Sequence, residues 1–224
     1  MGSGPTIRVS QQISLVFGSG GNGWNRGRIG RMTRALFIID VQNDFTEGGA
    51  LGVTGGAAVA EGITEYLREN AGSYDLVIAS RDWHDGDNDN GGHFAVEAEP
   101  DFVVTWPRHC VAGTPGAEYH PALDASLIDV HVKKGQGVPA YSIFEGVTDD
   151  GEELIELLDE KGVDVVHVAG IATDYCVLAS ARDALDAGRE VTVLTDLIAG
   201  VAPESSKAAL GELAAAGAEL LATR

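Results

Sequence analysis

The sequence predicts a single α/β domain with a doubly wound, mainly parallel sheet of six strands and helices on both faces. From residue 34 onward, short runs rich in β-branched residues alternate with longer runs rich in Ala, Leu and Glu, the order of successive βαβ units. Several short runs are apolar at every position, as strands covered on both faces require. The chain has 224 residues, 44% of them hydrophobic, which is enough for one sizeable core.

In the first half of the domain, residues 35–40 are apolar up to a final aspartate and predict the first strand. Residues 57–70 are rich in Ala and Glu and predict a helix, and the Leu-Val-Ile run that begins residues 76–80 predicts the second strand. Residues 129–133, with valines on either side of a histidine, predict the third. The intervening segment, residues 82–127, is rich in His, Asp, Gly, Pro and Trp, and loops of such length are usually functional.

In the second half, helices and strands alternate in the same way. Residues 152–161 predict a helix that Asp149 or Asp150 can cap, and the valine-rich residues 165–169 predict the fourth strand. The remaining predicted elements are helices at residues 174–187 and 203–216 and strands at residues 191–195 and 219–222.

The charge balance narrows the classes of partner. Fifteen Lys and Arg residues against 34 Asp and Glu give a formal net charge of −19, which repels phosphate backbones and anionic membrane surfaces. No run approaches the roughly 20 apolar residues that a membrane-spanning helix needs. Two cysteines, Cys110 and Cys176, are too few for a disulfide framework and suit a reducing cytosol. We therefore expect a soluble, cytoplasmic protein with no nucleic-acid or membrane partner, and homo-oligomer formation stays open.

The first 31 residues differ from the rest. They are rich in glycine and contain four arginines and no acidic residue, and the apolar run at residues 13–17 is too short for the core of a signal peptide. We expect residues 1–31 to be a disordered extension of upstream translated or vector-derived sequence, with Met32 as the natural start. The functional domain is then residues 32–224.

Three polar residues stand where predicted strands end, and in open α/β sheets binding sites lie outside the carboxyl ends of the strands. Cys176 follows the fourth strand at the start of a helix, where the helix dipole favours a thiolate and free N–H groups can bind an oxyanion. Asp40 could accept the thiol proton and return it to a leaving amine, and Lys134 could lower the pKa of the thiol. Each residue alone is also compatible with packing, a turn or a solvated strand end.

A second group of residues predicts a metal site. Asp82 and His84 follow the second strand, and His93 and His109 lie in the long loop after it. Three histidines and one carboxylate suit Zn²⁺, Mn²⁺ or Fe²⁺, with positions left for water or substrate. The alternative is a polar loop that holds histidines by chance. A calcium loop at residues 85–91 fits poorly, because its glycine is one position late and its flanks are not helical.

Five segments together resemble the isochorismatase-like cysteine hydrolases, and within them the nicotinamidases (pyrazinamidases). The resemblance extends from about Met32 to the C-terminus, in the order and spacing of that family. The segments are residues 35–45 (Ala-Leu-Phe-Ile-Ile-Asp-Val-Gln-Asn-Asp-Phe), 81–84 (Arg-Asp-Trp-His), 106–116 (Trp-Pro-Arg-His-Cys-Val-Ala-Gly-Thr-Pro-Gly), 134–135 (Lys-Gly) and 170–176 (Gly-Ile-Ala-Thr-Asp-Tyr-Cys).

The resemblance implies a role for each matched residue. Asp40, Lys134 and Cys176 would be the catalytic triad, with Lys134 preferred to its neighbour Lys133 by the match at Lys-Gly. The backbone N–H groups of Ala172 and Cys176 would form the oxyanion hole, next to a cis peptide between Ile171 and Ala172. The implied metal ligands are Asp82, His84, His93 and His109, and the implied substrate-binding residues are Phe45, Trp106, Tyr141, Ile171 and Tyr175.

Two departures from the family pattern affect these assignments. Residues 85–92 form a longer segment between His84 and His93 than nicotinamidases usually have, which makes His93 the least secure ligand. Tyr175 stands where histidine is common, and we expect it to change the shape of the pocket rather than the chemistry.

The predicted function is that of a nicotinamidase, an amidohydrolase that converts nicotinamide to nicotinate and ammonia through a thioester, also acts on pyrazinamide and takes part in NAD salvage. It would use one divalent transition metal ion, with Zn²⁺ preferred to Mn²⁺ or Fe²⁺. Three alternatives remain: a related activity such as isochorismatase or N-carbamoyl amidase, a metallohydrolase that uses metal-bound water, and a catalytically silent metal-binding or scaffold protein.

Overall fold

The computed structural model describes residues 31–224, so the predicted extension, residues 1–31, lies outside the described residues except for Arg31. The domain is built on a seven-stranded sheet with the order β4-β3-β2-β1-β5-β6-β7. Its strands are β1 (Thr33–Ile39), β2 (Leu76–Asp82), β3 (Val130–Lys134), β4 (Val147–Thr148), β5 (Val163–Ile171), β6 (Glu190–Ala199) and β7 (Glu219–Leu221). All pairs are parallel except β3 with β4.

The six predicted strands are all present, and the predicted fold class is confirmed with one correction to the strand count. The seventh strand, β4, contains only two residues and pairs with β3 through Val132–Thr148 and Lys133–Val147. A strand of two residues is too short to give a periodic signal in the sequence, which is why it was not predicted.

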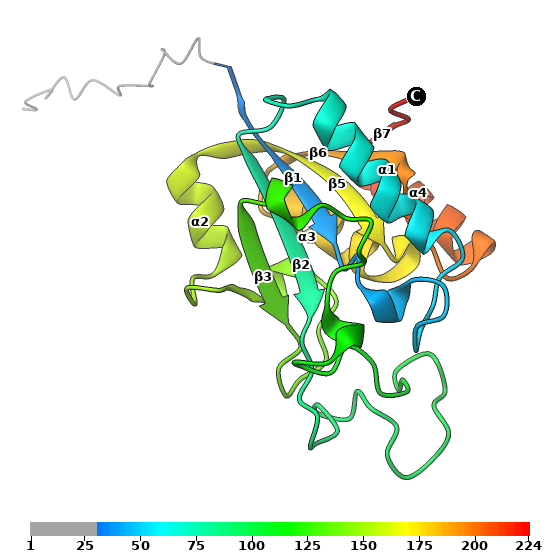
Figure 1. Ribbon diagram of the computed structural model, residues 1–224. Helices are drawn as coiled ribbons and strands as arrows, with labels where there is room; N and C mark the ends of the chain where they lie inside the picture. Colours follow the sequence, from blue (N-terminus) through cyan, green and yellow to red (C-terminus); the bar gives the residue numbers. More distant parts are fainter. Residues whose placement is uncertain (1–30) are drawn as a thin grey trace, which may run out of the picture. The chain divides into compact units, whose positions relative to one another are not determined.

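Four α-helices cover the sheet on both faces (Figure 1). On one face, α1 (Gly56–Glu69) buries Val59, Ile63 and Leu67 against alternate residues of the central strands. The second face is covered by α2 (Leu154–Lys161), α3 (Leu178–Asp186) and α4 (Pro203–Ala216). The central strand β1 is buried on both sides, as its continuous apolar sequence predicts. Within residues 31–224, no helix is long and apolar enough to cross a membrane.

Two helix boundaries differ from the sequence prediction. The helix α2 begins at Leu154 without a side-chain cap, so Asp149 and Asp150 do not cap it. They lie in a tight turn instead, in which the Glu152 N–H donates to Thr148 Oγ1 at 3.1 Å. The predicted helix at residues 174–187 is divided into a π-turn, η5 (Thr173–Val177), and α3. The sequence does not predict this division, because a π-turn cannot be distinguished from an α-turn over so few residues.

The carboxyl ends of β1, β2, β3 and β5 meet at one edge of the sheet, and the long green loop after β2 lies beyond that edge in Figure 1. The backbone turns sharply there: Asp40, directly after β1, has a left-handed φ of 49°, and Gly135, directly after β3, has a φ of 85°. A Cβ atom at position 135 would lie 2.5 Å from the His84 ring, so only glycine fits. This edge holds the candidate site.

Candidate active site

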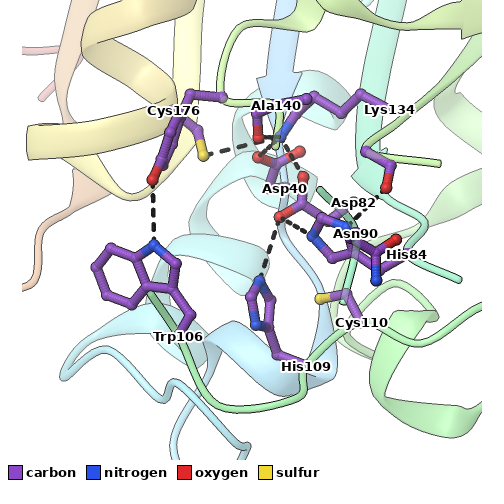
Figure 2. A network of polar contacts seen from close by, with 12 residues as sticks. Asp40, Asp82, His84, Asn90, Trp106, His109, Cys110, Lys134, Ala140 and Cys176 are labelled. Carbon is purple, nitrogen blue, oxygen red and sulfur yellow. Dashed lines mark hydrogen bonds and ion pairs between the residues drawn. The ribbon is translucent and has the colours of Figure 1, made fainter. Parts of the chain in front are cut away.

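The Lys134 ammonium contacts two carboxylates, those of Asp40 and Asp82, and the Cys176 thiol at the floor of the site (Figure 2). Its Nζ lies 2.9 Å from Asp40 Oδ2 and 3.8 Å from Cys176 Sγ, and it also contacts Asp82 Oδ1. Lys134 and Asp40 are completely buried, and Cys176 is 7% exposed. Lys134 therefore brings the predicted triad together, although Asp40 follows β1, Lys134 ends β3 and Cys176 lies in the turn after β5.

Asp40 is oriented by a residue that the sequence did not single out. The Ser80 hydroxyl donates to Asp40 Oδ1 at 2.7 Å, and the Asp40 N–H donates back to Ser80 Oγ at 3.3 Å. Ser80 lies on β2, next to β1 in the sheet, and is fully buried. With Oδ1 held in this way, Oδ2 is directed toward Lys134.

Burial opposes the thiolate that a helix start favours at Cys176. Burial raises the pKa of the thiol well above its usual value; Lys134 lowers it, and the Asp40 and Asp82 carboxylates raise it further. A helix dipole contributes only about 0.3–1 kcal/mol. Desolvation of a buried thiolate costs more than this, so burial outweighs the dipole. The thiol at rest is protonated and needs a base.

The electrostatic surroundings of Asp40 suit a proton acceptor. Burial raises the pKa of its carboxyl, and the Lys134 ammonium only partly offsets this effect. A raised pKa makes a carboxylate a stronger proton acceptor near neutral pH. Lys134 itself stays charged: burial lowers its pKa, but Asp40 and Asp82 together hold it well above the usual value.

Three buried histidines gather beside this group. One ligand-type atom from each of His84, His93 and His109 lies within 4.8 Å of the others. Asp82 Oδ2 faces the same point, 3.5 Å from His84 Nε2 and 3.7 Å from His109 Nε2. His93 belongs to the cluster in spite of the longer segment before it. Buried Asn90 closes that segment into a turn, because its side-chain oxygen accepts the Asp85 N–H at 2.8 Å. All four predicted metal ligands therefore converge.

The donor atoms fit a divalent transition metal ion. His84 Nδ1 and His109 Nδ1 lie 2.8 and 2.7 Å from backbone carbonyl oxygens, which only accept hydrogen bonds. This contact favours the tautomer that carries its proton on Nδ1 and leaves the Nε2 lone pair for a metal ion. His84 Nε2 and His93 Nδ1 are buried without a hydrogen-bond partner. Burial lowers the pKa of His93 to about 4, which keeps it neutral. Neutral imidazoles and one carboxylate are suitable ligands for such an ion.

A cavity of about 340 Å³ opens above the triad and the histidines. The predicted wall residues Phe45, Trp106, Tyr141 and Tyr175 all line it. Ile171 does not: its side chain is fully buried in the core beneath α1. The sequence did not predict several further lining residues, which are Ala50, Leu51, Gly52, Val53, Phe102, Ala140 and Val201.

Aromatic contacts fix one wall of the cavity. The Tyr175 ring stacks on Tyr141, with centroids 6.2 Å apart, and meets Trp106 edge to face at 5.3 Å. The Trp106 indole N–H donates to the Tyr141 hydroxyl at 3.1 Å. Tyr175 thus extends an apolar wall against which a flat ring can pack.

The peptide between Ile171 and Ala172 is cis, as the family resemblance implies. Ala172 lines the cavity next to Cys176. Its carbonyl accepts the N–H groups of Tyr175 and Val177 at 3.1 and 3.0 Å, which builds the turn that carries Cys176.

Gln42 and Asp44 hold the segments of the predicted metal ligands, and no feature of the sequence indicates either role. The buried Gln42 amide accepts from the Asp82 N–H at 2.8 Å and donates to the carbonyl oxygens of Asp82 and Ala117 at 2.9 and 2.8 Å. Asp44 Oδ2 accepts from the Cys110 N–H at 2.7 Å, directly after His109. The segment after β1 thus binds both the segment of Asp82 and the segment of His109.

Comparisons with known proteins agree with this geometry. The family model described as the isochorismatase domain matches residues 34–224. The chain is 50% identical over 188 residues to the nicotinamidase/pyrazinamidase of Mycobacterium tuberculosis, which covers 84% of this chain and 98% of that protein. It is 38% identical to the nicotinamidase of Escherichia coli, covering 84% of this chain and 93% of that protein.

Two solved structures are similar over comparable lengths. The pyrazinamidase of Pyrococcus horikoshii in complex with zinc has a TM-score of 0.70 at 37% identity, covering 84% of this chain and 98% of that one. PnC1 from L. infantum in complex with nicotinate has a TM-score of 0.73 at 36% identity, covering 86% of this chain and 93% of that one.

Proposed function

The chain belongs to the isochorismatase family, and on that premise we propose that it is a nicotinamidase that also accepts pyrazinamide. The observation that carries this proposal is the position of Lys134, which contacts Asp40 and Asp82 and lies 3.8 Å from Cys176 Sγ. An acid-base group, a nucleophile and a metal-ligand cluster therefore share the floor of one aromatic-lined cavity. The kinship with nicotinamidases and pyrazinamidases supports the choice of substrate.

The reaction uses the thiol of Cys176 as the nucleophile. Asp40 accepts its proton, and Lys134 stabilises the thiolate that attacks the amide carbon of nicotinamide. The backbone N–H groups of Ala172 and Cys176 bind the oxyanion of the tetrahedral intermediate. Asp40 then returns the proton to the departing ammonia, and water, deprotonated by Asp40, hydrolyses the thioester to nicotinate.

Phe45, Trp106, Tyr141 and Tyr175 hold the pyridine ring, and the ring nitrogen faces the histidine cluster. The cluster of His84, His93 and His109 with Asp82 would hold the ion, and zinc is the ion we favour because a related pyrazinamidase structure contains it. When bound, the ion would supply a Lewis acid beside the ring nitrogen. Fixing the ring in this way holds the amide carbon near the sulfur, which accounts for part of the rate.

One assay separates this function from its rivals. We expect ammonia release from nicotinamide and pyrazinamide, with much less from an N-carbamoyl amine. Preference for the carbamoyl substrate would point to an N-carbamoyl amidase. Failure to release ammonia from any of them by protein with bound metal would point to a catalytically silent binding protein.

Replacing a ligand tests the metal site directly. We expect His84→Ala to reduce the bound metal from about one ion per chain to a small fraction, because His84 contributes a preformed lone pair to the cluster. Metal content after dialysis, measured by mass spectrometry, reports the result. His120→Ala is the matched control, because His120 lies outside the cluster and its Nδ1 accepts the Ala122 N–H at 3.2 Å. Equal metal loss in both variants would refute the assignment.

Gln42 is expected to position the metal site through the backbone of Asp82. Gln42→Met removes the three hydrogen bonds of a buried amide while keeping its volume, and such losses behind a metal ligand typically weaken metal binding by about 10–100-fold. Calorimetric titration of the metal-free protein measures this change. Asn43→Leu is the control: Asn43 bonds the nearby Pro115 carbonyl at 2.7 Å but not Asp82. If Asn43→Leu weakens metal binding equally, the loop has a general structural role instead.

A further inference from the structure

The cavity continues outward from its floor into a part with apolar walls. At the floor, Asp82, His109 and Cys176 are at most 7% exposed, whereas at the mouth Phe102 and Val201 are 53% and 57% exposed. Ala50 and Leu51 also line the cavity and are at least partly exposed. We call Ala50, Leu51, Phe102 and Val201 the outer slot. All four of its residues are apolar.

Phe102 is held in place by its own turn. Asp101 Oδ1 accepts the N–H groups of Val103, Val104 and Thr105 at 2.9, 2.9 and 2.8 Å, and the Phe102 N–H donates to the Thr105 carbonyl at 3.1 Å. The turn places Phe102 at a φ of 57°, a left-handed conformation that costs a non-glycine residue roughly 1–2 kcal/mol.

The Phe102 ring is directed toward the cavity wall. It meets Trp106 edge to face, with centroids 6.2 Å apart, and Trp106 in turn contacts Tyr175. Val201 continues this strip, because its N–H donates to Asp174, the residue before Tyr175, at 2.9 Å. Phe102 contacts the aromatic wall through Trp106, and both Phe102 and Val201 line the cavity where it is exposed.

The outer slot is not needed for nicotinamide itself. A one-ring amide fills roughly 150 Å³ at the packing density of a protein interior, less than half of the 340 Å³ cavity. The orientation of the ring decides which atom faces the remaining space. With N1 at the histidines and the C3 carboxamide at Cys176, C2 points between these two floor sites. C5 lies opposite C2 across the ring, so it points to the mouth.

We propose that the outer slot binds an apolar substituent at C5 of the pyridine ring, so that the substrates include 5-alkylnicotinamides. This inference rests on the proposed function, because it uses the pose of nicotinamide described above. Phe102 and Val201 are then specificity-determining residues: they contact the substituent and leave the reacting atoms to the floor of the cavity.

The test compares kcat/KM for nicotinamide and its 5-methyl, 5-ethyl and 5-propyl derivatives. Each buried methylene contributes about 0.8 kcal/mol at most, so we expect kcat/KM to rise about two- to fourfold per added carbon in the wild type. In Phe102→Ser and in Val201→Ser, this rise should fall to less than about 1.5-fold per carbon, with nicotinamide measured in each variant as its own reference.

Val103→Ser is the matched control. Val103 is on the same turn as Phe102 and is 69% exposed, but it does not line the cavity, so this variant should keep the wild-type rise. A wild-type kcat/KM that falls with alkyl length overturns the proposal. The proposal also fails if Val103→Ser loses the increase of kcat/KM with alkyl length as Phe102→Ser does. Hydrolysis of nicotinamide without any rise refutes the outer slot alone, whereas no hydrolysis of nicotinamide refutes the proposed function.

Discussion

Cys176→Ala is expected to lower the turnover of nicotinamide by on the order of 10⁴-fold or more, the scale of loss when a catalytic nucleophile is removed. The fold should be retained, because alanine keeps the Cβ atom and removes only the sulfur from a site at the edge of a cavity. Ammonia release under saturating substrate measures the effect. Metal content should equal that of the wild type, since Cys176 is not part of the histidine cluster.

Cys110→Ala is the matched control, because Cys110 is the second cysteine of the chain and is completely buried near the same site. Its Sγ lies 3.9 Å from the Gly116 carbonyl oxygen and does not line the cavity, so turnover should stay near the wild-type rate. Acid quenching of the wild type with substrate should trap a nicotinoyl adduct on Cys176, detectable as added mass. Undiminished turnover by Cys176→Ala would instead support metal-bound water as the nucleophile.

Lys134→Met is expected to cost about 3–5 kcal/mol of the free energy of unfolding, because it leaves two buried carboxylates without their shared cation. It should also abolish turnover, since the Cys176 thiolate loses a neighbouring cation that lowers the pKa of the thiol. Urea denaturation followed by fluorescence measures the stability, and ammonia release from the folded fraction measures the activity.

Lys133→Met provides the comparison one residue earlier on β3. Lys133 pairs with the exposed Asp149 at 2.9 Å, and exposed pairs of this kind contribute at most about 1 kcal/mol. The variant should therefore stay close to the wild type in both measurements. Similar losses of stability and activity in the two variants would mean that the end of β3 tolerates no substitution. That result would refute a specific role for Lys134.

The fold could be predicted from the sequence because its signals are local and repeated. The strands are short β-branched runs and the helices are Ala-rich, so each element carries its own composition. The strand-end rule then places Asp40, Lys134 and Cys176 at one edge without knowledge of any contact. The elements that were missed, β4 and the π-turn η5, are too short to have a periodicity of their own.

The supporting residues of the site could not be predicted in the same way. Gln42 and Ser80 act through hydrogen bonds to residues 40 positions away, and nothing in their chemical type separates them from ordinary polar residues. The burial of Cys176 could not be predicted for a related reason: a helix start is visible in the sequence, but the depth of burial is not. Phe102 and Val201 belong to loops whose direction depends on turns such as the one built by Asp101.

The single ammonium of Lys134 has an evolutionary consequence. Because it pairs with both Asp40 and Asp82, a substitution at any one of the three changes the charge balance felt by the other two. The effect of a mutation at Asp82, a proposed metal ligand, should therefore depend strongly on whether Asp40 and Lys134 are intact. A descendant could not abandon the metal by losing its histidines alone. Asp82 would remain as a buried anion that competes for Lys134, so the path to a metal-free enzyme should pass first through position 82.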